Sequence, residues 1–239
     1  MVFSDTTTKD GLIQDCELNV FGSYGEITGD SDRMYEFTAR LNRALDKYDA
    51  KVKLVDGRFQ KDDPNYTDLP IASANIVSGQ KDYTMDIQFL DIEKVVLQDE
   101  AGNKLVLNPF DIQDPIAYSY LTNIGTVTGI PNWYDKTGDS LMLYPTPNYN
   151  KTLGLTVHYR RKPSYFVYTD TSKTPGVPWT LQRYISLEAS LDYAISKQIT
   201  KKKDLQVKVK EMEDLIEATF SARSRDESKR VVGVFRSAR

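Results

Sequence analysis

Apolar residues recur with two different periods along this 239-residue chain, and the change of period separates helical regions from strand regions. Apolar residues spaced three and four apart lie on one face of a helix. This spacing predicts a first helix over residues 31–49 and helical structure over residues 180–222, interrupted at the lysine run 201–203. The pattern leaves open whether the late segment is a hairpin of two helices or one kinked rod.

Residues 72–168 follow a period of two instead, and Gly, Pro, Asn and Asp punctuate them at short intervals. Both features are typical of antiparallel strands. In the clearest strand, Leu153, Leu155, Val157 and Tyr159 alternate with polar residues, so we expect one apolar and one polar side. The predicted fold class is α+β, a helical bundle of one N-terminal and two C-terminal helices with an inserted antiparallel β-sandwich or barrel-like domain.

The two ends of the chain lack either period over most of their length. Residues 1–29 are rich in Thr, Gly and Asp, and we expect them to form an extended arm. Residues 223–239 mix six basic residues with two acidic ones and an apolar VVGVF run. The predicted organisation is therefore an N-terminal arm (1–29), a folded body (30–222) and a basic C-terminal tail (223–239).

Charge and cysteine content restrict the possible environments. With 31 basic and 34 acidic residues the net charge is −3, so the molecule lacks the positive field that drives tight binding to DNA phosphates. Its one cysteine, Cys16, cannot form an intrachain disulfide, which favours folding in a reducing cytosol. No apolar run approaches the roughly 20 residues that span a bilayer, and the first residues do not form a secretion signal. We therefore expect no membrane association.

The residue types that carry most enzyme chemistry are sparse here. The single histidine, His158, falls on the predicted polar side of a strand, where we interpret it as an exposed strand residue and not as a catalytic base. One histidine and one cysteine cannot supply a structural zinc site. The carboxylates are numerous, but nothing in the sequence pairs two of them across a cleft. We predict no catalytic residue, no metal, no cofactor and no enzymatic activity.

The C-terminal tail is the strongest candidate for a binding segment. Burying its four apolar side chains yields roughly 6 to 10 kcal/mol. Ordering some seventeen residues costs on the order of 17 to 34 kcal/mol in backbone entropy. We therefore expect the tail to fold only against a partner, for example by adding a strand to a sheet edge. The alternative is an unstructured terminus that is basic for solubility.

Three segments together resemble the head-to-tail adaptor (connector) proteins of tailed bacteriophages. They are SDRMYEFTARLNRALDKY (31–48), GIPNWYDKTGDSLMLYPTPNYNKTLGLTVHYRRKP (129–163) and PWTLQRYISLEASLDYAI (178–195). Within the second segment, Gly129, Pro131 and Gly138, the run Leu141 to Pro147, and the Tyr159-Arg160 strand end occupy the places of the family pattern. The resemblance covers roughly residues 28–222.

The resemblance implies a structural virion protein at the head–tail junction, assembled in the host cytoplasm. Copies of the chain would form a ring, usually a dodecamer, beneath the portal protein. The ring would extend the DNA channel, contact the passing double-stranded DNA weakly and non-specifically, and offer a docking platform to tail, stopper or nozzle proteins. In such proteins the C-terminal segment grips the portal, which implies portal-binding roles for Arg223, Arg225, Lys229, Arg230, Val231, Val232, Val234, Phe235, Arg236 and Arg239.

Other readings of the sequence stay open. A neighbouring tail or stopper ring protein would share the hairpins but lack the portal-binding tail. A virion enzyme that degrades cell-wall carbohydrate is motivated by the abundant Asp, Glu and Tyr residues. A carbohydrate-binding β module would use Trp133, Tyr134 and Tyr149 as a stacking platform, although these aromatic residues also suit the interior of the β region.

Overall fold

The structure, a computed structural model, describes residues 1–55, 63–84, 91–111, 113 and 127–228, with the backbone alone described for 222–228. The chain divides into two compact units. Residues 1–67 and 163–239 belong to the first, which we call the helical unit, and residues 68–162 form the second, the β unit. The β unit is thus inserted into the helical unit, and the predicted α+β class with a barrel-like domain is confirmed.

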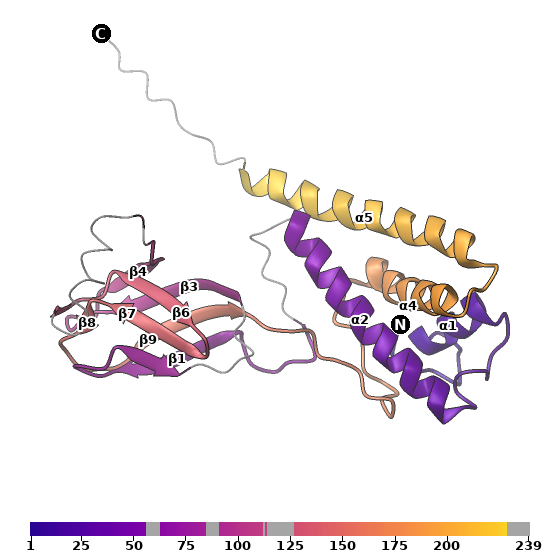
Figure 1. Ribbon diagram of the computed structural model, residues 1–239, viewed down its shortest axis with the longest axis horizontal. Coiled ribbons are helices and arrows are strands. Elements are labelled where there is room, and N and C mark those ends of the chain that lie inside the picture. The colour runs from indigo at the N-terminus through magenta and orange to yellow at the C-terminus, as the bar shows by residue number, and fades with distance from the viewer. Residues whose placement is uncertain (56–62, 85–90, 112, 114–126, 229–239) are drawn as a thin grey trace, which may run out of the picture. The chain divides into compact units, whose positions relative to one another are not determined.

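The helical unit is built around α4 (Gln182–Ser196), which the 3-10 turn η1 (Trp179–Leu181) precedes. Three other helices pack on α4, as Figure 1 shows: α1 (Leu12–Val20), α2 (Ser31–Val55) and α5 (Lys202–Ser228). Burial on almost all sides of α4 is possible because small residues, among them Ser186, Ala189, Ser190 and Ala194, alternate with large ones. α4 therefore lacks the broad polar face that a surface helix presents to solvent.

The late helical segment is two separate helices and not one kinked rod. After α4 the N–H of Gln198 donates to the carbonyl of Ile195 at 3.3 Å, and the N–H of Ile199 donates to the carbonyl of Ala194 at 2.9 Å. Gln198 has a φ of 55°, the left-handed conformation that ends many helices with this pair of bonds. The next helix, α5, begins at Lys202. The break between the two helices therefore covers residues 197–201 and includes the first lysine of the run 201–203.

The prediction of an extended arm over residues 1–29 is wrong for much of that segment. Residues 12–20 form α1, and Phe3, Leu12, Ile13 and Cys16 are completely buried in the core of the helical unit. The loop after α1 is fixed by the buried carboxylate of Glu17, which accepts hydrogen bonds from the N–H groups of residues 27 and 28 at 2.8 and 2.9 Å. The glycines and threonines that suggested an arm serve instead as turns around a buried helix.

Two predicted helix ends also differ from the structure. The first helix continues from the expected end at residue 49 to Val55, because its last turn keeps good helix formers and buries Val52. At the other end, α5 continues past residue 222 to Ser228. The sequence ARSRDES contains no Gly or Pro that would stop a helix, so residues 223–228 are helical and the predicted tail begins later.

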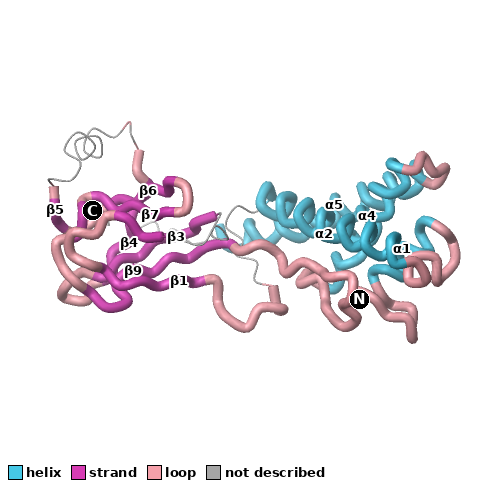
Figure 2. Tube along the Cα trace, turned by 60° about the horizontal axis from the view of Figure 1, so that its bottom comes forward, coloured by secondary structure: helices cyan, strands magenta, loops and turns pink. Residues whose placement is uncertain are grey.

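The β unit is a seven-stranded sheet that curls into a nearly closed barrel-like form, with strand order β1-β9-β3-β4-β6-β7-β2 (Figure 2). Its strands are β1 (Ile71–Ile76), β2 (Asp82–Thr84), β3 (Asp91–Gln98), β4 (Lys104–Pro109), β6 (Trp133–Thr137), β7 (Ser140–Tyr144) and β9 (Lys151–Arg160). All neighbouring pairs are antiparallel except β4 and β6, which pair in parallel. Two short strands, β5 (Thr128–Gly129) and β8 (Thr146–Pro147), form a separate parallel pair.

The predicted alternation in β9 is confirmed for most of the strand. Leu155, Val157 and Tyr159 are buried, whereas Leu153 is 60% exposed, so its placement on the apolar side is wrong. The register with β1 shifts beside Leu153, whose φ is 50° and whose N–H donates to the side chain of Asn75 at 2.8 Å. A bulge of this kind turns the side chain away from the row that a period of two predicts.

Residues 138 and 139 form the turn of a β-hairpin that joins β6 and β7. Thr137 of β6 pairs with Ser140 of β7, and Gly138 between them has a φ of 60°. Together with Val95, Leu97, Leu107 and Leu155, the buried Leu141 and Leu143 of this hairpin belong to the core of the β unit.

Candidate functional site

The predicted portal-binding residues lie at and beyond the end of α5. Arg223 and Arg225 belong to the last turns of this helix, where the backbone is described. Eight of the predicted residues lie outside the described residues: Lys229, Arg230, Val231, Val232, Val234, Phe235, Arg236 and Arg239. The candidate binding segment is therefore a helical end followed by residues 229–239, and its role stays a prediction.

The helix that carries this segment is firmly anchored. Leu205, Val209, Ile216 and Phe220 form one buried face of α5, and Phe220 meets the ring of Tyr48 on α2 edge-on, with 6.5 Å between ring centroids. The helix continues from Phe220 to Ser228, about 12 Å at a rise of 1.5 Å per residue. Residues 229–239 thus follow a helix whose base is fixed in the core.

A groove of ≈480 Å³ lies between the last turn of α2 and the C-terminal half of α5. Aliphatic and charged side chains line it together: Lys51, Leu54, Val55, Lys210, Glu213, Ile216, Glu217 and Ser221. Leu54 is 86% exposed, while Ile216 is completely covered. The groove therefore offers an apolar surface with charges around it, close to the part of α5 that leads to the predicted binding segment.

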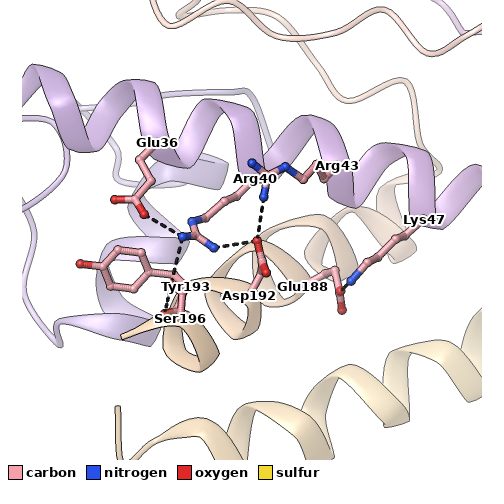
Figure 3. A network of polar contacts seen from close by, with 8 residues as sticks. All are labelled: Glu36, Arg40, Arg43, Lys47, Glu188, Asp192, Tyr193 and Ser196. Atoms are coloured by element: carbon pink, nitrogen blue, oxygen red, sulfur yellow. Dashed lines mark hydrogen bonds and ion pairs between the residues drawn. The ribbon is translucent and has the colours of Figure 1, made fainter. Parts of the chain in front are cut away.

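Charged side chains also cross between α2 and α4, as Figure 3 shows. The guanidinium of Arg40 donates to Asp192 at 2.6 Å, to Glu36 at 2.7 Å and to Ser196 at 3.0 Å, and it lies over the ring of Tyr193. We call this group the Arg40 network. Arg40 is only 9% exposed, so the hydrogen bonds of the network take the place of the hydrogen bonds to water that an exposed guanidinium would make.

The basic residues of α2 are neutralised along this contact. Arg43 contributes a second, longer contact to Asp192 at 3.4 Å, and Lys47 pairs with Glu188. One turn later, Lys51 pairs with Glu213 of α5 at 2.9 Å. Carboxylates of the same unit therefore neutralise this row of basic side chains, which does not form a positive surface for nucleic acid.

The aromatic residues of the alternative carbohydrate platform do not share one exposed surface. Tyr149 is buried, and its hydroxyl donates to the carbonyl of Gln98 at 2.9 Å. Tyr134 is partly buried against the core of the β unit, and Trp133 is half-buried. At least two of the three side chains therefore pack in the interior of the β unit, which is the alternative to a stacking platform that the sequence also suggested.

The residues that could carry acid–base chemistry are packed or dispersed. Burial raises the pKa of the Tyr48 and Tyr184 hydroxyls far above the ordinary value, which moves both further from the range in which they could exchange protons near neutral pH. His158 is half-buried in β9 beside Tyr159. Across the described ranges, no cluster of His, Cys, Asp and Glu has the arrangement of a metal site. Nor does any helix there combine the length and apolarity needed to cross a membrane.

Sequence reasoning missed both the buried N-terminal helix and the groove. For α1 a signal was present, since Leu12, Ile13, Cys16 and Val20 follow the spacing of one helix face. For the groove there was none, because Leu54 and Glu217 are far apart in the sequence and come together only when α2 and α5 pack.

Comparison with known protein families gives one match. A family described as SU10 adaptor protein matches residues 23–229, which include the whole β unit and, in the helical unit, α2, α4 and α5 but not α1. A search of curated proteins finds no match.

Proposed function

The chain belongs to the SU10 adaptor protein family of bacteriophage head–tail adaptors, and from this membership we propose that it forms a ring beneath the portal. This ring, a dodecamer in our proposal, extends the DNA channel of the virion and gives the tail its docking platform. The observation that carries the proposal is the family match over residues 23–229. The protein is a virion component, and we place its assembly in the host cytoplasm.

The portal contact is assigned to the end of α5 and the residues that follow it. A helix anchored by Ile216 and Phe220 holds its C-terminal end in a fixed position on the subunit. The remaining residues 229–239 contain the VVGVF run and four basic side chains. In a ring, each docked tail raises the effective concentration of the next, so modest single contacts add up to stable attachment.

The contact with DNA in the channel is weak in this proposal. The net charge is −3, and Arg40, Lys47 and Lys51 of α2 are paired with carboxylates of the same unit. A channel that bound phosphates tightly would slow the passage of DNA and make it strongly dependent on salt. We expect the channel wall to be neutral or acidic.

The proposal is structural and not enzymatic, in line with membership of an adaptor family. The nearest alternative is a neighbouring tail or stopper ring protein, which also contacts copies of itself and other virion proteins. The two differ in the portal contact, because a stopper would not need residues 229–239 for attachment to the portal.

Co-sedimentation with the purified portal protein tests the proposal. Removal of residues 229–239 is expected to abolish binding, whereas the chain that ends at Ser228 keeps the described helices intact. In a matched control, serines replace Val231, Val232, Val234 and Phe235 while the basic residues remain. Loss of binding in both variants supports apolar docking of the tail, and unchanged binding of the shortened chain contradicts the portal assignment.

Light scattering with and without the portal tests the ring. The expected result is a mass that rises with the portal to that of a ring of adaptor subunits. If the portal complex never gains more than the mass of one adaptor subunit, ring formation is contradicted.

A further inference from the structure

The groove between α2 and α5 has an unusual combination of surfaces. Its wall includes Leu54, which is 86% exposed at the end of α2, and its base includes the buried Ile216 of α5. A single exposed leucine is ordinary on a protein surface. An exposed leucine beside a groove of ≈480 Å³ with an aliphatic base instead offers a place for one or two apolar side chains.

The charges around the groove leave one carboxylate available. Lys51 is paired with Glu213 at 2.9 Å, and Lys210 is paired with Asp214 at 2.9 Å. Within the described part of the chain, Glu217 lines the groove without an ion pair of its own. An occupant that combines apolar side chains with a basic one would fit both the aliphatic base and this carboxylate.

Residues 229–239 of the same chain have that composition and begin close by. Val231, Val232, Val234 and Phe235 lie between the basic pairs Lys229-Arg230 and Arg236-Arg239. Ser221 lines the groove, and α5 ends at Ser228, about 10 Å further along the helix. Seven extended residues span about 23 Å, so a chain that turns back after Ser228 brings residue 235 to the level of Ile216.

We propose that, in the subunit that has not yet met the portal, residues 231–235 lie in the α2–α5 groove of their own chain, with a basic neighbour paired to Glu217. The same chain is favoured over a second copy because a segment tethered at Ser228 has an effective concentration in the millimolar range at this groove. The inference rests on the proposed function in one respect, that the portal takes over the same apolar side chains.

This arrangement gives the tail two alternative binding places. In the free subunit the groove covers side chains that would otherwise be exposed and prone to self-association. On the portal the tail leaves the groove and Leu54 loses its cover, whereas Ile216 stays buried by the helices of its own unit. Portal binding is therefore a competition, and weakening the groove is expected to strengthen the contact with the portal.

Limited digestion of the full-length free protein with trypsin tests the groove, with cleavage after Arg230 followed by mass spectrometry. Replacing Leu54 with Gln removes the exposed apolar wall, and Leu54→Gln is expected to accelerate this cleavage about tenfold if about nine in ten tails are bound. The matched control is Val207→Gln, since Val207 is a 59% exposed aliphatic residue of α5 that does not line the groove. Equal cleavage rates for the two variants and the wild type would overturn the proposal.

A disulfide experiment supplies a second readout that separates the same chain from a neighbouring one. Leu54→Cys combined with Phe235→Cys is expected to give a cross-link within monomers at low protein concentration, whereas Val207→Cys with Phe235→Cys is not. Cys16 does not interfere, because complete burial raises the pKa of its thiol and keeps it unreactive. Cross-linked dimers alone, or equal yields for the two pairs, would overturn docking within one chain.

The two proposals fail independently in these experiments. If the groove variants behave like the wild type while removal of residues 229–239 still abolishes portal binding, the inference is wrong and the proposed function stands. If the tail is protected by the groove but the shortened chain binds the portal normally, the portal assignment is wrong.

Discussion

The two units of the molecule are built from the chain in different ways. The core of the helical unit combines residues from the first turns of the chain to the last, from Phe3 to Phe220. The core of the β unit uses one continuous segment, residues 68–162. A continuous segment can fold as soon as it is complete, whereas the helical unit must wait for α4 and α5. We infer that the β unit is the more independent of the two.

Their polar contacts differ as well. In the helical unit the Arg40 network and the Lys51–Glu213 pair join helices that are distant in the sequence. In the β unit, Arg160 pairs with Glu93 on the neighbouring strand, and Arg161 pairs with Asp68 near the start of the unit. The charges of the helical unit therefore join separate helices, while those of the β unit support contacts that the sheet already makes.

The largest expected effect comes from a matched pair of core deletions. Leu41 and Leu97 are both completely buried, one in each unit. Leu41→Ala and Leu97→Ala are each expected to lower the free energy of unfolding by about 2–5 kcal/mol, since each leaves a cavity. In differential scanning calorimetry, each variant should shift only the transition of its own unit. A shared shift of one single transition would show that the two units do not unfold independently.

A pair of glycine substitutions gives a smaller effect and compares the same units. Gly176 has a φ of 62°, and an added Cβ would lie 2.3 Å from the Asp63 carboxylate, which also accepts hydrogen bonds from Asn65 and Ser164. Gly176→Ala is expected to lower the free energy of unfolding of the helical unit by about 2–4 kcal/mol. Gly138→Ala has the same backbone strain at a φ of 60° but no atom within 4 Å, so about 1–2 kcal/mol is expected for the β unit. Chemical denaturation measures both, and equal losses would contradict the role of the Asp63 contact.

Removing a charge from the Arg40 network is expected to affect the helical unit alone. Asp192 accepts from both Arg40 and Arg43, and Asp192→Asn weakens these contacts while keeping the shape of the side chain. A loss of about 1–2 kcal/mol in the free energy of unfolding is expected, because Arg40 keeps Glu36 as a partner. The control is Asp214→Asn, which removes the exposed pair with Lys210 and should change stability by less than about 0.5 kcal/mol. Equal effects in the two variants would argue against a structural role for the network.

The smallest expected effect is the response to alkaline pH. Burial raises the pKa of Tyr48 and Tyr184 above the value of about 10 that a tyrosine has in the unfolded chain. The unfolded chain therefore releases these protons first, so the stability present below pH 10 falls as the pH rises above it. The melting temperature of the helical unit should drop by about 3 °C between pH 10 and pH 11. Tyr184→Phe should reduce that drop, and an unchanged drop would contradict this origin.

Much of the fold could be predicted from the sequence, because the period of the apolar residues directly reflects helix and strand geometry. The predicted helix over residues 31–49 and the buried row of Leu155, Val157 and Tyr159 are examples. Errors arose where a local rule gave way to packing. Leu153 follows the alternation but lies at a bulge, and residues 12–20 form a helix inside a segment whose glycines and threonines suggested an arm.

The candidate site was predictable in composition but not in geometry. The basic and apolar residues beyond Ser228 can be recognised from the sequence, since their burial cannot offset the entropy of ordering them alone. The groove could not be predicted, because it depends on where the last turn of α2 meets α5. The same holds for Glu217, which is one of several similar carboxylates along α5 until the packing of the helices is known.

The two ends of the β unit are joined at its base. Arg161 Nη1 lies 2.9 Å from the Asp68 carboxylate, and the N–H of Tyr159 donates to the carbonyl of Pro70 at 3.2 Å. A module whose first and last residues touch can be lengthened, shortened or replaced without moving the helices that flank it in the sequence. Insertions or replacements between residues 70 and 159 can thus be accommodated while the helices of the helical unit keep their packing.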